Sequence, residues 1–417
     1  MQSSPVVPVP VSFAACYAAW RRARRGKKPS TNQLGFEARW LDRLMDLHTA
    51  LRAGQWQPSR TVCFVVTHPK TREIHAPDFA DRVVHHLLVA RLEKLYEPHF
   101  IHDSYANRAG KGSHAAVDRL QTMMRRRENM PLQQAVGGWY LQLDIHNYFN
   151  SIHRPTLYAM LCTRLDQAQR CGQLPAAHAL ALRSLCHKLL ANPVAQHVRD
   201  PQAAAQIPAH KRLCNASAHC GLPVGNLTSQ FFANVYLNAL DQFVKHTLKV
   251  RHYVRYVDDF VLLGDSAAQL LEWQARISQF LAQHLRLRFK DGALLQPCSQ
   301  GVDFLGYRVF AHYRRVRPRV VHHCQAKLQA WHRQHPLFTC VSAAEVAQLH
   351  ALLGSYWGHF SHAHTVRLRH WLFAKNAWLN QYFCLAPDGS MSRAMPARWQ
   401  VLRRRAILPL FKSCVAN

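Results

Sequence analysis

Two adjacent acids, Asp258 and Asp259, lie between runs of residues that favour β-strands. Residues 253–257 and 260–263 are rich in Val, Tyr and Phe, so we expect a strand, a tight turn and a second strand, with the acids at the tip. A further acid, Asp144, ends an apolar stretch of its own. Neighbouring half-buried carboxylates are costly unless cations neutralise them. The pattern therefore predicts that the three acids converge on two divalent metals about 4 Å apart, which can catalyse in-line displacement at phosphorus.

The acid pair has a simpler interpretation as an exposed hairpin turn, because Asp is common in turns. That interpretation does not explain Asp144, which lies in a separate apolar strand and is followed by two aromatic residues, Tyr148 and Phe149. The three acids together favour the metal interpretation.

The charge of the chain indicates a polyanionic partner. Lys and Arg number 53 against 23 acids in 417 residues, which gives a net charge of +30. A single basic cluster is usually a solvated face, but several clusters along a chain suit contacts with many phosphates. The clusters comprise residues 21–28, 125–127, 314–319 and 403–405.

The chain exceeds one ordinary domain, and its 48% hydrophobic residues are enough for a sizeable core. Strands alternate with helices but also form a hairpin, so a mixed α+β fold is expected. Residues 166–220 are poorly patterned and are expected to form helices with a loop, and the chain after residue 311 is basic and mostly helical. The predicted helices cover residues 13–20, 36–51, 77–96, 113–127, 231–248 and 273–287, with another from Pro155, and the predicted strands cover residues 61–66 and 140–143.

The 12 cysteines include no C-x-x-C pair. In a long chain whose start lacks the pattern of a secretory signal, they are expected to be reduced thiols in the cytoplasm. No stretch has the length and apolar character of a transmembrane helix. We therefore expect a cytoplasmic protein without a membrane partner.

The order of these motifs resembles reverse transcriptases over roughly residues 60–310. The run Tyr256, Val257, Asp258 and Asp259 matches the family's Y-x-D-D box, and Asp144 followed by Phe149 matches its first metal-binding motif. Within the family the chain is most similar to enzymes of diversity-generating retroelements, a bacterial branch. This similarity rests on Val224-Gly225-Asn226-Leu227-Thr228-Ser229-Gln230 and on residues 72–77, 81–86 and 103–108.

The resemblance implies a right-hand polymerase with fingers, a palm built on an antiparallel sheet, and a helical basic thumb. Its domains would be a helical N-terminal extension (residues 1–59), fingers and palm (60–310) and thumb (311–417). It also implies two Mg²⁺ ions, for which Mn²⁺ can substitute. Asp144 and Asp258 would be the direct ligands, Asp259 would contribute less directly, and the carbonyl of Ile145 would be a further ligand.

Other residues match the family's nucleotide site. Lys70 and Arg72 would grip the triphosphate, although a solvated charged loop is the alternative. Phe149 would exclude a 2′-hydroxyl, unless it is an ordinary core aromatic. Gly225 would let the backbone approach the nascent base pair, and Val224 stands where most family members have Gln, which suggests low fidelity. Gln230 completes this nucleotide-binding motif.

Three weaker assignments follow from the same resemblance. The run Phe304, Leu305, Gly306 and Tyr307 is similar to the primer-grip hairpin, although a β-turn packed into the core fits it as well. Lys290 would donate a proton to pyrophosphate. Arg82 and Arg108 would contact template or nucleotide backbone.

Two groups of metal-binding residue types were weighed as zinc sites. His210, Cys214, His219 and Cys220 lie within eleven residues, but their spacing matches no zinc finger. A second group has no nearby carboxylate and suits helix packing or RNA contact better. It consists of His359, His362 and His364.

The resemblance implies an RNA-directed DNA polymerase, a nucleotidyltransferase that makes cDNA from a structured template RNA and dNTPs. Its leading role would be error-prone synthesis in a diversity-generating retroelement, with a small basic helical-bundle protein as accessory partner. The alternatives are a reverse transcriptase of antiphage defence with its own non-coding RNA, and an inactive RNA-binding scaffold.

Overall fold

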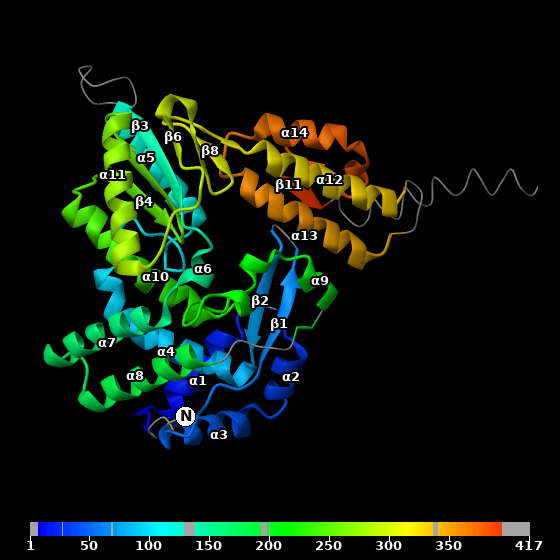
Figure 1. Ribbon diagram of the computed structural model, residues 1–417. Coiled ribbons are helices and arrows are strands. Elements are labelled where there is room, and N and C mark those ends of the chain that lie inside the picture. Colours follow the sequence, from blue (N-terminus) through cyan, green and yellow to red (C-terminus); the bar gives the residue numbers. More distant parts are fainter. Residues whose placement is uncertain are drawn as a thin grey trace, which may run out of the picture. The chain divides into compact units, whose positions relative to one another are not determined.

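The computed structural model describes residues 7–26, 28–67, 70–128, 138–192, 198–199, 201–336 and 341–393. The basic run at residues 403–405 lies outside these ranges. The chain forms two compact units, the first from residues 1–116 and 139–296 and the second from residues 117–138 and 297–417 (Figure 1). Helices and antiparallel sheets occur in both, so the expected mixed α+β class is confirmed.

The first unit begins with three helices that pack with α4 (Phe79–Tyr96). They are α1 (Phe13–Ala23), α2 (Thr31–Glu37) and α3 (Trp40–Arg52). One helix was expected over residues 36–51, but Arg39 leaves the helical region at φ −132° and separates α2 from α3. The break lets Trp40 stack on Trp20 with ring centroids 4.9 Å apart, which buries apolar surface that a continuous helix would not bring together.

A hairpin and a group of helices follow. Strands β1 (Thr61–Val66) and β2 (Arg72–Pro77) are antiparallel, with Cys63 opposite His75. Helices α7 and α8 form an adjacent pair, and Figure 1 shows α9 near β1. Residues 166–220, where helices with a loop were expected, hold the end of α7 (Arg154–Arg170), α8 (Ala176–Ala191) and α9 (Pro201–Ala205).

The central sheet of the first unit has the strand order β4-β5-β3-β6. Its strands are β3 (Trp139–Asp144), β4 (Tyr253–Tyr256), β5 (Asp259–Gly264) and β6 (Leu294–Pro297). Helix α11 (Ala267–Phe280) packs on β3 and β5, while α10 (Leu227–Gln242) packs on α4 and α7. Short α6 (Tyr148–Ser151) follows β3. The sheet and these helices share one apolar core with the N-terminal helices.

The second unit contains most of α5 (Ser113–Glu128) and the sheet β7-β8-β9. Arg314 pairs with Asp118 at 2.7 Å, and the Gln121 amide donates to the Phe310 carbonyl at 2.9 Å, so α5 is tied to this sheet. The other elements are β7 (Val302–Phe304), β8 (Tyr307–Val309), β9 (Arg314–Val316), α12 (Pro318–Gln334), α13 (Ala343–Phe360), α14 (Val366–Lys375), β10 (Phe383–Leu385) and β11 (Met391–Arg393).

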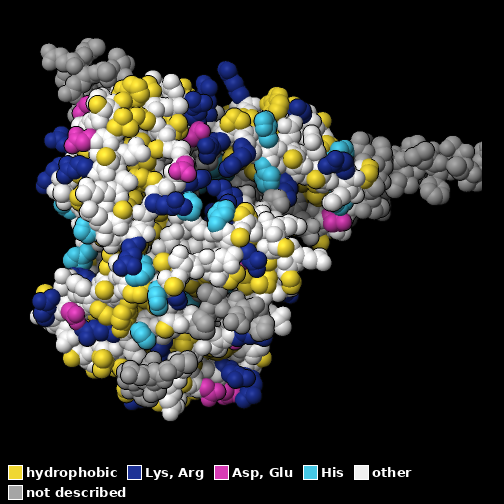
Figure 2. All heavy atoms as spheres, viewed as in Figure 1, with side chains coloured by type: hydrophobic (Ala, Val, Ile, Leu, Met, Phe, Trp, Pro, Cys, Tyr) yellow, Lys and Arg dark blue, Asp and Glu magenta, His cyan; other side chains and the backbone are white. Residues whose placement is uncertain are grey.

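Basic side chains are spread over the surface. Figure 2 shows Lys and Arg over much of the visible face, with few acids among them. This distribution accords with the net charge of +30 and favours a polyanionic partner. Among the described residues, no helix has the length and apolar character needed to cross a membrane.

Candidate active site

The three acids of the candidate site lie on neighbouring strands of the central sheet. Strands β4 and β5 pair with Tyr256 opposite Asp259, which leaves Val257 and Asp258 as a two-residue turn. Asp259 is in turn opposite Asp144 at the end of β3. The amide of Gln142 donates to Asp259 Oδ1 at 3.0 Å. The sheet register therefore brings together acids that are more than a hundred residues apart in sequence.

The turn that carries Asp258 is strained. Val257 has φ 58°, a left-handed conformation that is rare for a β-branched residue. Such a conformation costs about 1–3 kcal/mol and persists only where its surroundings enforce it. One enforcing contact is visible, because Nη1 of Arg255 donates to the Val257 carbonyl at 2.9 Å.

Arg255 belongs to a buried polar network that the sequence analysis missed. It is fully buried and donates to both carboxylate oxygens of Asp241 on α10, at 2.8 and 2.5 Å. Tyr253 also donates to Asp241, at 2.8 Å, and Asn234 accepts from Arg255 at 3.3 Å. The available signal was a single Arg inside an otherwise apolar strand, because a charge is rarely buried without a partner.

Burial alone would lower the pKa of Arg255, but the Asp241 carboxylate outweighs this effect and raises the pKa. Arg255 therefore remains charged. One of the motifs quoted for the family resemblance lies beside it: the Arg255 amide donates to Asp103 at 2.9 Å, and Tyr105 donates to the Arg255 carbonyl at 3.0 Å. These two backbone hydrogen bonds tie residues 103–105 to β4.

The electrostatics of the acids suit a divalent cation. Burial and the nearby charge of Asp144 raise the pKa of Asp258 from its usual value to about 6, while Arg72 and Lys70 act in the opposite direction. Asp144 remains open to solvent, with 48% of its side chain exposed. Clustered carboxylate oxygens that repel one another are a fitting donor set for Mg²⁺. Asp144 and Asp258 could hold such ions, with Asp259 beside them.

Lys70 and Arg72 lie at the start of β2, as expected from the sequence. Because both influence the pKa of Asp258, their positive charges lie within electrostatic reach of the acids. The structure therefore places two cations near the carboxylates, where the phosphates of a nucleotide would need them.

Val224 and Gly225 contact β2. The Val224 carbonyl accepts from the His75 amide at 2.7 Å. Gly225 has φ +115°, and a Cβ there would lie 2.8 Å from Cγ2 of Ile74. The close approach of β2 and the backbone conformation both require glycine here. The expected approach of this backbone to a base pair stays a prediction.

Phe149 lies in α6, five residues after Asp144. Its ring is partly buried, makes an edge contact with Tyr148 at 5.6 Å and packs against the core. The Phe149 carbonyl accepts from the Leu222 amide at 2.8 Å, which ties α6 to the segment that leads into Val224. Gln230 lies in the first turn of α10, where its amide donates to Asn226.

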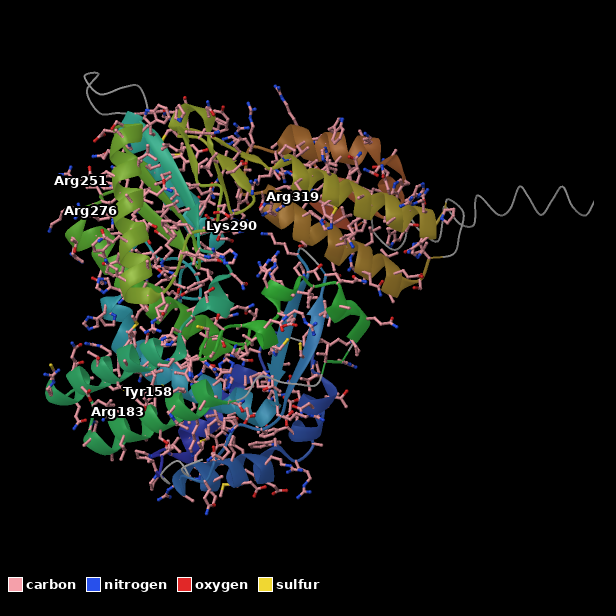
Figure 3. All side chains as sticks on the ribbon, viewed as in Figure 1. Tyr158, Arg183, Arg251, Arg276, Lys290 and Arg319 are labelled. Carbon is pink, nitrogen blue, oxygen red and sulfur yellow. The ribbon has the colours of Figure 1, made fainter. Side chains whose placement is uncertain are left out.

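Lys290 also lies beside the acids and is labelled near the end of β3 in Figure 3. Its amide donates to the Asp144 carbonyl at 2.8 Å, and its Nζ is 3.9 Å from Asp144 Oδ2. Ile145 pairs with Phe289 in an isolated bridge, so this segment flanks the metal-binding motif. Lys290 is 62% exposed and can move towards a ligand.

The two remaining arginines differ. Arg82 is half-buried over the ring of Phe79, 5.6 Å from its centroid. Arg108 was expected near template or nucleotide, and here a correction is needed. Its guanidinium donates to Glu97 through two nitrogens and to the carbonyls of Ile101 and Ser104, and its side chain is only 6% exposed. Arg108 is thus used within the protein as a structural tie.

The run proposed as a primer grip forms the turn between β7 and β8 in the second unit. Phe304 and Tyr307 are fully buried, and the Tyr307 hydroxyl donates to the His359 carbonyl at 2.7 Å. Leu305 and Gly306 occupy the two turn positions, at φ 48° and 93°. The run is therefore a tight turn packed into the core, as the alternative interpretation held.

Neither histidine-containing group weighed as a zinc site gathers its ligand atoms. Tyr307 stacks on His359, and the amide of Arg314 approaches His364 Nδ1 at 3.5 Å. In the described part of the chain, one group of three metal-ligating residues does converge. It consists of Cys63, Glu73 and His75, and the sequence analysis did not single it out as a group.

An antiparallel sheet that brings three acids together suits two-metal chemistry on nucleotides. The model of the family described as reverse transcriptase (RNA-dependent DNA polymerase) matches residues 67–309, more than half of the chain. The chain therefore belongs to the reverse transcriptase family and is an enzyme of the RNA-directed DNA polymerase class.

Individual relatives are distant. The chain is 23% identical to protein YkfC of Escherichia coli K12 over 313 residues, covering 67% of this chain and 74% of YkfC. It is 22% identical to the group II intron-encoded protein LtrA of Lactococcus lactis over 305 residues, 58% of this chain but only 44% of LtrA. A telomerase structure from Candida albicans, in complex with a fragment of telomeric RNA, has a TM-score of 0.42 and 12% identity, covering 77% of this chain and 56% of that chain.

Proposed function

We propose that this protein copies a structured RNA into DNA by two-metal nucleotidyl transfer. In this proposal the fingers and palm lie within residues 60–310, the thumb lies within 311–417, and residues 1–59 form a helical extension. The observation that carries the proposal is the pairing of Asp144 with Asp259 next to Asp258, whose pKa is raised to about 6 by burial and by Asp144. Carboxylates this close together disfavour one another's charged form, which a bound cation would stabilise.

The residues have complementary roles in this proposal. Asp144, Asp258 and the Ile145 carbonyl would hold the ions. Bound Mg²⁺, or Mn²⁺ in its place, would acidify the primer 3′-hydroxyl and stabilise the leaving pyrophosphate. Lys70 and Arg72 orient the triphosphate of the incoming dNTP, and Lys290 supplies a proton to the pyrophosphate. The hairpin at residues 304–307 contacts the primer.

Phe149 selects the sugar in this proposal. Its partly exposed ring follows the strand that ends in Asp144, and a ring beneath the ribose would clash with a 2′-hydroxyl. We expect Phe149→Ala to admit ribonucleotides with little loss of dNTP incorporation. The measurement is single-nucleotide primer extension with each sugar, with Phe243→Ala as a matched aromatic control. Unchanged sugar discrimination in Phe149→Ala would reject this role.

The biological role we propose is error-prone cDNA synthesis in a diversity-generating retroelement. Val224 supports it, because an apolar residue replaces the Gln that contacts the incoming nucleotide in most reverse transcriptases and so weakens checking of the base pair. The accessory partner would be a small basic helical bundle. The ten described cysteines are all free thiols, which suits a reducing cytoplasm.

The test is to sequence nucleic acid that co-purifies with the wild-type protein and with Asp258→Ala from native cells. cDNA with changes concentrated at template adenines, absent from the variant, supports the proposal. Faithful or repetitive DNA copied from a separate non-coding RNA would replace the retroelement role by a role in antiphage defence. RNA alone in both samples would contradict DNA synthesis and favour an RNA-binding scaffold.

A further inference from the structure

Three metal-ligating side chains converge on the hairpin β1–β2, and none of them is one of the three acids. Cys63 on β1 is directly opposite His75 on β2, and Glu73 lies two residues before His75 on the same face of the strand. All three are buried, with exposures of 1%, 2% and 8%. One ligand atom from each lies within 4.8 Å of the others, so small side-chain adjustments would bring them to one ion.

His75 shows that this group is incomplete. Neither of its ring nitrogens has a hydrogen-bond partner among the described residues, although the ring is almost fully buried. The nearest carboxylate oxygen, Glu73 Oε2, is 3.6 Å from Nε2, too long for a hydrogen bond. Leaving a buried polar group unsatisfied destabilises the folded protein. A ligand that binds a ring nitrogen would remove this cost.

The segment before Gly221 encloses the same group. The amide of Leu213 donates to Glu73 Oε2 at 2.9 Å, and Arg212 pairs with Glu73 Oε1 at 3.4 Å. Cys214, which was considered for zinc from the sequence, follows Leu213 directly and is exposed.

We propose that Cys63, Glu73 and His75 bind a zinc ion. Thiolate, imidazole and carboxylate donors are typical of zinc. Mg²⁺ favours an all-oxygen set and would bind at the acids. The zinc would link β1–β2 to the segment at residues 212–214 and stabilise β2. Strand β2 carries Arg72, and its His75 amide donates to the Val224 carbonyl.

The test is elemental analysis of the full chain, expressed without a histidine tag in zinc-supplemented medium and purified without chelators. We expect about one zinc per chain, falling to background in Cys63→Ser and His75→Gln. Cys16→Ser, at another buried cysteine of the first unit, and Asp258→Ala, at the candidate active site, should keep the zinc. A wild-type protein without zinc, or full zinc content in Cys63→Ser, would overturn the proposal.

A second measurement covers the case in which Cys63→Ser fails to fold. Wild-type protein is stripped with a chelator, returned to buffer and titrated with Co²⁺. The proposed site predicts a thiolate-to-cobalt charge-transfer band at one equivalent, reversed by Zn²⁺, and a higher Tm with either metal. Folded, stripped protein that shows neither the band nor the change in Tm would refute the site, whatever the behaviour of the variants.

Discussion

The hairpins β4–β5 and β7–β8 both have two-residue turns, but they accommodate positive φ angles in different ways. Each begins its turn with a residue other than glycine at positive φ, Val257 at 58° and Leu305 at 48°. In β7–β8 the next residue is Gly306, which adopts its φ of 93° without strain, and the turn then packs into a core through Tyr307. In β7–β8 the residue types of the turn and the packing around it therefore both stabilise the hairpin.

In β4–β5 the residue types of the turn do not suit its conformation and surroundings. Val257 is β-branched, and the residue after it is an acid whose charge is disfavoured by burial and by Asp144. A fully buried arginine, Arg255, bonds to the turn carbonyl and is itself neutralised by Asp241. Residues that lower stability but are held in place by a buried hydrogen-bond network are expected at a functional site and not at a purely structural turn.

The largest effect should come from removing the acid. We expect Asp258→Ala to lower DNA synthesis at least about a thousandfold, since a metal ligand supplies several kcal/mol of transition-state stabilisation. The fold should survive, because the ionised carboxylate is disfavoured where it is. Primer extension on an RNA template measures the loss, and Asp265→Asn, an exposed acid just after β5, is the control. Robust synthesis by Asp258→Ala would refute the assignment.

The support of the turn should matter next. Arg255→Met leaves the Asp241 carboxylate buried without its partner, and breaking such a pair costs about 3–5 kcal/mol of unfolding free energy. Urea denaturation measures this loss. Arg251→Met, at an exposed position labelled in Figure 3, should change it by less than about 0.5 kcal/mol. If both variants lose the same small amount, Arg255 does not support the hairpin.

Much of this comparison could be predicted from sequence, because local pattern fixes local structure. Alternating strand formers around two acids predicted β4–β5, and the apolar run before Asp144 predicted β3. The proximity of Asp144 to Asp259 follows from sheet register, which a single segment does not specify. The sequence predicted that the three acids converge, but not that Asp144 would lie opposite Asp259.

Other features could not be predicted because they depend on contacts between distant segments. Arg255 and Asp241 are fourteen residues apart and lie on a strand and a helix. Arg108 resembles a nucleic-acid contact by residue type, but its role is decided by Glu97 and two carbonyls. Cys63 and His75 become neighbours only through the register of β1 and β2. In each case the partner, and not the residue type, determines the function.

A smaller effect concerns pH. The folded-state pKa of Asp258, about 6, is above its ordinary value near 4. The protonated acid is therefore favoured by folding, and metal-free protein should lose stability as pH rises from about 4 through 6. Mg²⁺ competes with that proton, so its apparent affinity should fall about tenfold per pH unit below pH 6.

Thermal unfolding across this pH range, with and without Mg²⁺, measures both effects. Asp258→Asn cannot ionise, so it should remove this part of the pH dependence and raise the Tm of the metal-free protein above pH 6. An identical pH profile for Asp258→Asn and wild-type protein would mean that Asp258 does not titrate near pH 6.

The smallest expected effect comes from replacing the first turn residue of each hairpin by glycine. Glycine relieves left-handed strain of about 1–3 kcal/mol but adds about 0.5–1 kcal/mol of unfolded-state entropy. For Val257→Gly we therefore expect a net gain of about 1 kcal/mol in unfolding free energy, together with slower DNA synthesis, because a freer turn aims Asp258 less well. Leu305→Gly should gain less or lose stability, because Leu is not β-branched and its half-buried side chain would be lost. Urea denaturation of the two variants measures both changes. A larger gain in unfolding free energy for Leu305→Gly than for Val257→Gly would show that the strain at Val257 is not a property of the catalytic hairpin.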